Sequence, residues 1–251
     1  MIHAASDFLA ETTGRLTALS ESAAAGDYDD AVSLLVESLN AGGVIQAFGT
    51  GHSQAFAMEI AGRAGGLIPT SKIALSDLVF FAGRPVADLE GPDLERDPDV
   101  VDQLLDSAPI QPEDVFVIAS NSGVNGSIVG LALAAKERGH RVIAVTSMEH
   151  THAVTPKHAS GKRLADIADV VIDNLAPYGD VSLTFGDSYR AGALSSLTAA
   201  YIAQMLTIGV VERMISAGQE PPLYISANQP GGDEHNQVLE DTYRGRLRRL
   251  G

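Results

Sequence analysis

The chain contains no cysteine, and basic residues are scarce in it. The absence of cysteine excludes disulfides and thiol catalysis, and it is compatible with a reducing compartment. The 17 lysines and arginines face 32 aspartates and glutamates, which gives a formal net charge of −15. A surface of that sign repels nucleic acid and anionic membranes. We therefore predict neither as a partner.

Long apolar runs are also missing. No uninterrupted stretch approaches the roughly 18 residues that would suggest a membrane-spanning helix. The opening residues, MIHAASDFLAETTGR, have no basic segment followed by an apolar run, so no secretory signal is expected. We predict a cytoplasmic protein, and the length of 251 residues suits one large α/β domain with helical additions.

The few basic residues gather only near the end of the chain, as Arg244, Arg246, Arg248 and Arg249. A patch of this kind could bind an anionic partner, but a solvated or intersubunit tail is the simpler interpretation. We expect such a tail.

Hydrophobic patterning divides the chain into alternating strands and helices. Two amphipathic helices are expected at about 3–24 and 28–40, and residues 1–41 are assigned to an N-terminal helical extension of a compact domain spanning 42–251. Five near-continuous apolar runs predict buried strands: Val44–Phe48, Leu67–Ser71, Val115–Ala119, Val142–Thr146 and Val170–Asp173. Strands of this kind, separated by helices, indicate a parallel sheet covered on both faces.

A long apolar helix is expected over Ala191–Ala217, followed by a Pro/Gly-rich loop and a final helix. The long helix is hydrophobic nearly all round, which indicates burial in a core or between subunits. Together with the N-terminal helices it predicts a homodimer or homotetramer.

Two of the predicted strands end in glycine- and serine-rich turns that lead into helices. The first turn is GTGHS, residues 49–53, and the second is SNSGVNGS, residues 120–127. Small residues let the backbone approach an anion closely, and free N–H groups at a helix start point toward it. Two turns of the same build predict one phosphate held by two loops.

The two turns together resemble those of the SIS (sugar isomerase) domain, whose loops read roughly G-x-G-x-S and S-x-S-G-x-T/N. The resemblance runs from about Ala41 to the end, and it is nearest to the uncharacterised stand-alone SIS proteins of bacteria, whose SGKRLADIADVVID- and NQPGGDEHN-like segments occur here. It implies a Rossmann-like, three-layer α-β-α sandwich with a five-stranded parallel sheet in the flavodoxin-like order 2-1-3-4-5. Both turns would then face one cleft.

The resemblance implies a phosphosugar ligand and no organic cofactor. The residues expected to contact phosphate and sugar are Thr50, Gly51, His52, Ser53, Ser120, Asn121, Ser122, Gly123 and Asn125. The alternative is that these serines and asparagines only cap helices, because capping and phosphate binding use the same geometry.

Isomerisation needs groups that move a proton between adjacent carbons and open the sugar ring. Glu59, six residues after Ser53, is the first candidate. Similar heptose-phosphate isomerases carry histidine at that place and the catalytic glutamate four residues later, where this chain has Arg63. The alternative is a helical ion pair between Glu59 and Arg63.

The second candidate is His235 in the GGDEHN segment, because several SIS enzymes bring a C-terminal histidine into the cleft, often from a neighbouring subunit. The alternative is a surface histidine beside a helix cap at Asp233, and Glu234 is a lesser carboxylate candidate. Another cluster, Glu149, His150, His152 and His158, has the residue types of a metal site, but its loose spacing favours a solvated loop, and we predict no metal.

These residues predict a phosphosugar-binding protein, foremost a phosphosugar isomerase. The alternatives are a non-catalytic phosphosugar sensor and a lyase related to the etherases that act on muramic acid phosphate.

Overall fold

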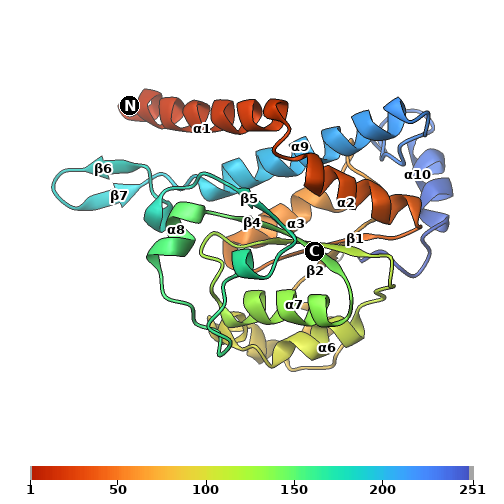
Figure 1. Ribbon diagram of the computed structural model, residues 1–251, viewed down its shortest axis with the longest axis horizontal. Helices are drawn as coiled ribbons and strands as arrows, with labels where there is room; N and C mark the ends of the chain where they lie inside the picture. The colour runs from red at the N-terminus through yellow and green to blue at the C-terminus, as the bar shows by residue number, and fades with distance from the viewer. Residues whose placement is uncertain (1, 249–251) are drawn as a thin grey trace.

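A computed structural model of the chain describes residues 2–248 (Figure 1). Its centre is a five-stranded parallel sheet in the order β2-β1-β3-β4-β5, as predicted. The strands are β1 Ile45–Gly49, β2 Thr70–Ile73, β3 Val115–Ala119, β4 Arg141–Thr146 and β5 Val170–Asp173. Only β2 departs from its expected bounds by more than about one residue.

Each central strand is buried on both faces, which explains its uninterrupted apolar sequence. In β3, Val117 and Ala119 belong to the core above the sheet, whereas Phe116 and Ile118 belong to the core below it. The alternation of side chains along a strand sends them to opposite faces.

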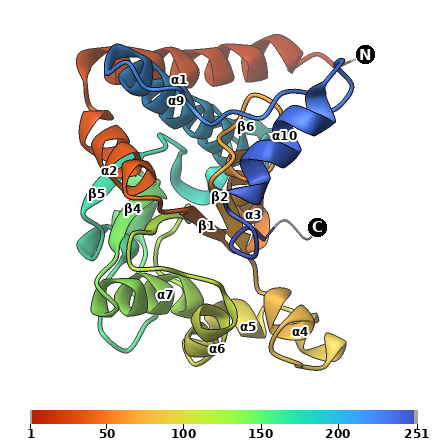
Figure 2. The ribbon, with the colours of Figure 1, turned by 90° about the vertical axis from the view of Figure 1, so that its right-hand side faces the viewer.

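Helices cover both faces and make a three-layer α-β-α sandwich (Figure 2). The upper layer holds α1 Ala5–Ala25, α2 Asp29–Asn40, α3 Gln54–Ile60 and α9 Ser195–Ser216. The lower layer holds α4 Asp77–Phe80, α5 Asp93–Arg96, α6 Val100–Ser107 and α7 Gly126–Glu137. Outside these layers lie α8 Met148–Ala153, α10 Gly232–Asp241 and the 3₁₀ turns η1 Gly51–Ser53, η2 Val86–Leu89, η3 Leu164–Asp166 and η4 Tyr178–Asp180.

The two N-terminal helices differ in how they join the domain. Helix α2 packs on α9 and on β1 and β3, and its Val32, Leu35 and Leu39 are part of the upper core. Helix α1 lies across α9 (Figure 1) and buries only Leu19 completely. The boundary at residue 41 stays a prediction, but α2 contributes to the same core as the sheet.

An antiparallel hairpin, β6 Leu183–Phe185 and β7 Tyr189–Ala191, projects from the body before α9 (Figure 1). The expected long helix therefore starts at Ser195 rather than Ala191. The sequence VSLTF followed by Gly186-Asp187-Ser188 alternates apolar and polar residues before a turn, which is a hairpin signal.

The expectation of a solvated tail holds for Arg244, whose side chain is 78% exposed, but it is wrong for Arg246 and Arg248, and Arg249 lies outside the described residues. The Arg246 guanidinium bonds to the Asp114 carboxylate and donates to the Gly42 carbonyl oxygen at 2.7 Å. The Arg248 guanidinium stacks over the Phe81 ring at 3.8 Å from its centroid. Arg246 docks because the Asp114 carboxylate is fully buried and needs a counter-charge, and Arg248 lies 3.9 Å from the buried Asp77 carboxylate.

Within residues 2–248, none of the helices has the length and apolarity that a membrane crossing would require.

Candidate functional site

The candidate site lies where the strand order reverses, at the carboxyl ends of β1 and β3. These strands are neighbours with Gly49 opposite Ala119, so the two predicted loops leave the sheet side by side. Open parallel sheets bind ligands in the crevice at this point.

The first loop turns tightly because its glycines allow it. A Cβ on Gly49 would lie 2.3 Å from the carbonyl oxygen of Ser53, a distance that only glycine permits. Thr50 is extended and buried, and Gly51 then takes a left-handed φ of +54° at the start of η1. The turn thereby delivers His52 and Ser53 to the start of α3.

The second loop is fixed from below. The Ser120 hydroxyl accepts the Gly123 N–H at 3.1 Å, and the Gly123 carbonyl oxygen accepts the Leu164 N–H at 2.8 Å. Asn125 is the extended N-cap of α7, and its side chain makes no capping bond. The first-turn N–H groups of α7 are therefore left without a side-chain cap.

One small pocket joins the two loops. From the predicted set it takes His52, Ser53, Ser120 and Asn121, and it adds Asn174, Ser195 and Ser196, which sequence reasoning missed. Hydroxyl and amide groups predominate among its polar lining, and these are the groups that donate to phosphate and sugar oxygens. Its volume is about 10 Å³, enough for about one water molecule, so a larger ligand requires the pocket to widen.

The residues that sequence reasoning missed come from the edge strand β5 and from the start of α9. Asn174 follows the carboxyl end of β5, a position that the topology alone could have identified, and its amide donates to the Asn121 side chain at 3.2 Å. Ser195 begins α9, where Asp180 accepts both its N–H at 2.7 Å and its hydroxyl at 2.6 Å. The Ser195 hydroxyl is thus already engaged.

Other predicted contacts do not line this pocket. Asn125 turns away: its amide nitrogen bonds to Glu95 of α5, and its amide oxygen accepts the Lys157 ammonium at 3.2 Å. Ser122, which is partly exposed, is not among the lining residues. Gly51 lies on the Glu95 side, with that carboxylate 3.4 Å from where a Cβ would be.

Glu59 is held by other partners. Its Oε1 bonds to the Arg63 guanidinium, in the helical ion pair that was the alternative expectation for Glu59, and accepts the Gln204 amide at 2.6 Å. Gln204 lies five residues beyond Ala199, the last α9 residue in the pocket lining, which is about 7.5 Å at the rise of an α-helix. A catalytic role for Glu59 stays a prediction.

His235 lies at the opposite end of the sheet from the pocket. Its Nε2 is 3.0 Å from the Leu223 carbonyl oxygen, and Leu223 bridges to Leu67, just before the start of β2. Figure 1 shows α10 on the opposite side of the molecule from the β6–β7 hairpin, and the chain reaches that hairpin after it leaves the carboxyl end of β5. His235 could therefore reach a pocket only in a second copy of the chain.

The histidine cluster separates in the structure. The His150 ring accepts the Gly179 N–H at 2.9 Å and stacks on Tyr178, while the His158 ring bonds to Ser160. Among residues 2–248, no group of three or more histidine or acidic side chains is placed to hold a metal ion.

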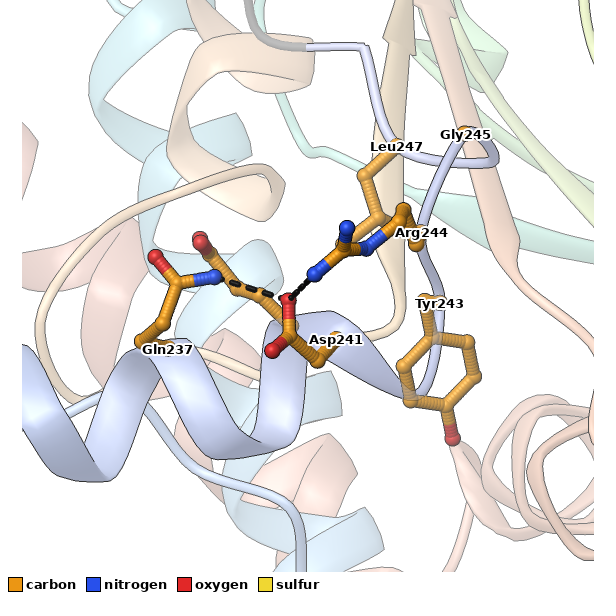
Figure 3. A pocket seen from close by; sticks show the side chains of 7 residues that line it. Gln237, Asp241, Tyr243, Arg244, Gly245 and Leu247 are labelled. Atoms are coloured by element: carbon orange, nitrogen blue, oxygen red, sulfur yellow. Dashed lines mark hydrogen bonds and ion pairs between the residues drawn. The ribbon is translucent and has the colours of Figure 1, made fainter.

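A larger hollow of about 490 Å³ lies by the end of α10, far along the chain from both loops (Figure 3). Its walls are α10 and the turn after it, and Asp241 accepts the Arg244 guanidinium and the Gln237 amide. The Arg244 bond is the main reason that the pKa of Asp241 lies below its usual value. Neither glycine-serine loop contributes a residue to the lining of this hollow, so it is separate from the candidate site.

Comparison with known proteins gives a family match. Residues 7–147 match the family model described as the SIS domain. The chain is 36% identical to a UPF0309 protein of Caldanaerobacter subterraneus, covering 88% of this chain and 89% of that protein. It is also 36% identical to a UPF0309 protein of Listeria monocytogenes, covering 92% and 94%.

Solved structures share the fold at low identity. A phosphoheptose isomerase from Francisella tularensis superposes with a TM-score of 0.55 at 15% identity, covering 84% of this chain and 100% of that one. An Escherichia coli CFT073 protein in complex with A5P has a TM-score of 0.54 at 17% identity, covering 85% and 91%.

Proposed function

Since this chain belongs to the SIS domain family, we propose that it binds a sugar phosphate and isomerises it by proton transfer between adjacent carbons. One observation carries the proposal: two glycine-serine turns leave neighbouring strands at the switch point and line one polar pocket. The fold shared with a phosphoheptose isomerase, and with a protein that holds A5P, supports the same ligand class.

In this proposal the phosphate is bound by local donors, because the chain as a whole is acidic. Ser53, Ser120 and Asn121 donate from their side chains, and the uncapped N-terminus of α7 adds N–H groups and a favourable dipole. Lys157 supplies a cation beside the second loop. Ser122 remains a proposed contact at the rim once the pocket widens.

The sugar extends from the phosphate toward the pocket mouth, where the reaction takes place. An isomerase needs a base for the carbon-bound proton and an acid–base group for ring opening. Glu59 and His235 are the sequence's candidates for these roles, and His235 would act from a second copy in a dimer or tetramer.

The proposal is tested by incubating the protein in deuterated water with a panel of hexose and amino-sugar phosphates. Binding is measured by calorimetry, and proton exchange at C2 is followed by NMR. Binding together with exchange on at least one sugar phosphate is the expected result. Binding without exchange on any of them would indicate a sensor, cleavage of a muramic acid phosphate would indicate an etherase-like lyase, and absence of binding would remove the ligand class.

A further inference from the structure

A carboxylate that sequence reasoning missed lies between the two loops. Glu95 belongs to α5, a single helical turn in the irregular stretch before α6. Its carbonyl oxygen accepts the Ser127 hydroxyl at 2.7 Å, and its neighbour Leu94 is buried in the lower core. The main chain of Glu95 is therefore fixed against α7 from two sides.

Close packing of main chain on main chain adds to this. A Cβ on Gly126 would lie 2.0 Å from the carbonyl oxygen of Arg96, so α5 approaches the second loop as nearly as it does only because residue 126 is glycine. This close approach places the side chain of Glu95, the residue before Arg96, over the loop that precedes α7.

The Glu95 side chain spans the two loops. Its Oε1 accepts the Asn125 amide of the second loop, and its Oε2 lies 3.4 Å from the Cβ position of Gly51 in the first. In the part of the chain that the structure describes, Oε2 accepts no hydrogen bond. One oxygen thus orients the carboxylate, and the other remains available to a ligand held by the loops.

Glu59 is turned toward α9 and not toward the second loop. Its Oε1 bonds to both Arg63 and Gln204, and Gln204 lies further along α9 than the residues that line the pocket. Glu95 is the carboxylate that the fold brings to both loops at once.

We propose that Glu95 is the catalytic base of this site, taking the C2 proton of a sugar phosphate held between the loops. The inference rests on the proposed isomerase function. Glu95 removes the C2 proton from the open-chain aldose, the C–H electron pair forms the C1=C2 bond, and the carbonyl pair moves to O1. The O2 hydroxyl proton then passes to O1, the O2 pair forms the C2=O bond, and the C1=C2 pair takes the proton back from Glu95 at C1.

The test compares Glu95→Gln with wild type on a sugar phosphate that wild type exchanges. Glutamine keeps an oxygen acceptor for Asn125 but cannot take a proton, so the dissociation constant should stay within about threefold. The exchange rate at C2 should fall about 100-fold or more, as is usual when a general base is lost. Glu95→Asp should restore part of the rate, and thermal melting checks that each variant is folded.

A matched variant serves as the control. Glu90→Gln removes an exposed carboxylate from the same irregular stretch and should keep the wild-type exchange rate. A folded Glu95→Gln variant that exchanges at the wild-type rate would overturn the role of Glu95 and leave the isomerase function intact. Absence of exchange in wild type on every sugar phosphate would overturn both.

Discussion

Gly126 and Arg96 pack so closely that a Cβ on residue 126 would lie 2.0 Å from the Arg96 carbonyl oxygen. No neighbouring side chain can move aside to relieve this contact, because the opposing atom belongs to the main chain. The position of α5 over the second loop, and with it the position of Glu95, depends on the missing side chain.

Replacing Gly126 with alanine should therefore destabilise the protein by about 1–3 kcal/mol, the usual cost of overpacking. Gly14→Ala is the matched control: Gly14 lies in the exposed interior of α1 with open space around its Cβ position. That change should stabilise the protein by about 0.5–1 kcal/mol. Urea unfolding of both variants checks the pair, and equal effects would contradict the packing argument.

Removal of the Ser53 hydroxyl should weaken sugar phosphate binding. Ser53 lines the pocket, and a hydrogen bond to a charged group contributes about 1.5–3 kcal/mol, so Ser53→Ala should raise the dissociation constant roughly 10- to 100-fold. Ser188→Ala, on the exposed turn of the β6–β7 hairpin, should leave binding unchanged. An unaltered dissociation constant for Ser53→Ala in calorimetry would remove this hydroxyl from the site.

Ser122→Ala tests the second loop in the same assay. Ser122 is partly exposed and outside the pocket lining, so its loss should cost little stability. We expect weaker binding if the pocket widens onto this hydroxyl. A dissociation constant equal to that of wild type would exclude Ser122 from the contacts.

Arg246→Ala should destabilise the fold by about 3 kcal/mol, because it removes the charged partner of a buried carboxylate. Asp114 is fully buried and also accepts the Val44 N–H and the Gln46 amide, both at 2.8 Å, so these neutral donors remain. Arg244→Ala removes a guanidinium that is 78% exposed and should cost less than about 1 kcal/mol. Chemical denaturation that ranks the two variants equally would argue against this.

Asp169 should make stability fall at low pH. Burial raises the pKa of Asp169, but the bonds from Lys136 and the Val142 N–H, together with the charge of Arg141, outweigh burial and hold the pKa below its usual value. A carboxylate with a depressed folded pKa stabilises the protein above about pH 4, its unfolded value, and loses that effect as pH falls through the folded pKa.

The Asp169→Asn variant should accordingly be less stable than wild type by about 1–2 kcal/mol at pH 7, and the gap should narrow toward pH 3. Asp102→Asn, which removes a largely exposed partner of Arg138, should show a small gap at every pH. The measurement is urea unfolding across the pH range, and a gap that widens in acid would be inconsistent with the depressed pKa.

Much of the fold could be predicted because a strand that is buried on both faces needs an uninterrupted run of apolar side chains. Strands β1, β3, β4 and β5 are runs of apolar residues between glycines, prolines and polar turns, and two such runs ended in the loops that form the pocket. The β6–β7 hairpin was not predicted, because its short second strand comes just before α9 and the apolar pattern of the two appears continuous in the sequence.

The rest of the site depends on tertiary contacts that leave no local pattern. Glu95 lies in a stretch without periodicity, and only the approach of Arg96 to Gly126 brings it to the loops. The contact of Arg246 could not be predicted either. Its partner, the buried Asp114, is far away in sequence, and no residue near Arg246 indicates that this carboxylate needs a counter-charge.

The contact between Asp114 and Arg246 also sets an order of events during synthesis. The two residues are 132 positions apart in the chain, and the carboxylate emerges first, directly before β3. At about 5–20 residues per second, a nascent chain carries Asp114 without its guanidinium for roughly 7–26 s. Until Arg246 emerges, the Asp114 carboxylate can be stabilised by water and by the two neutral donors that it keeps in the folded protein, the Val44 N–H and the Gln46 amide.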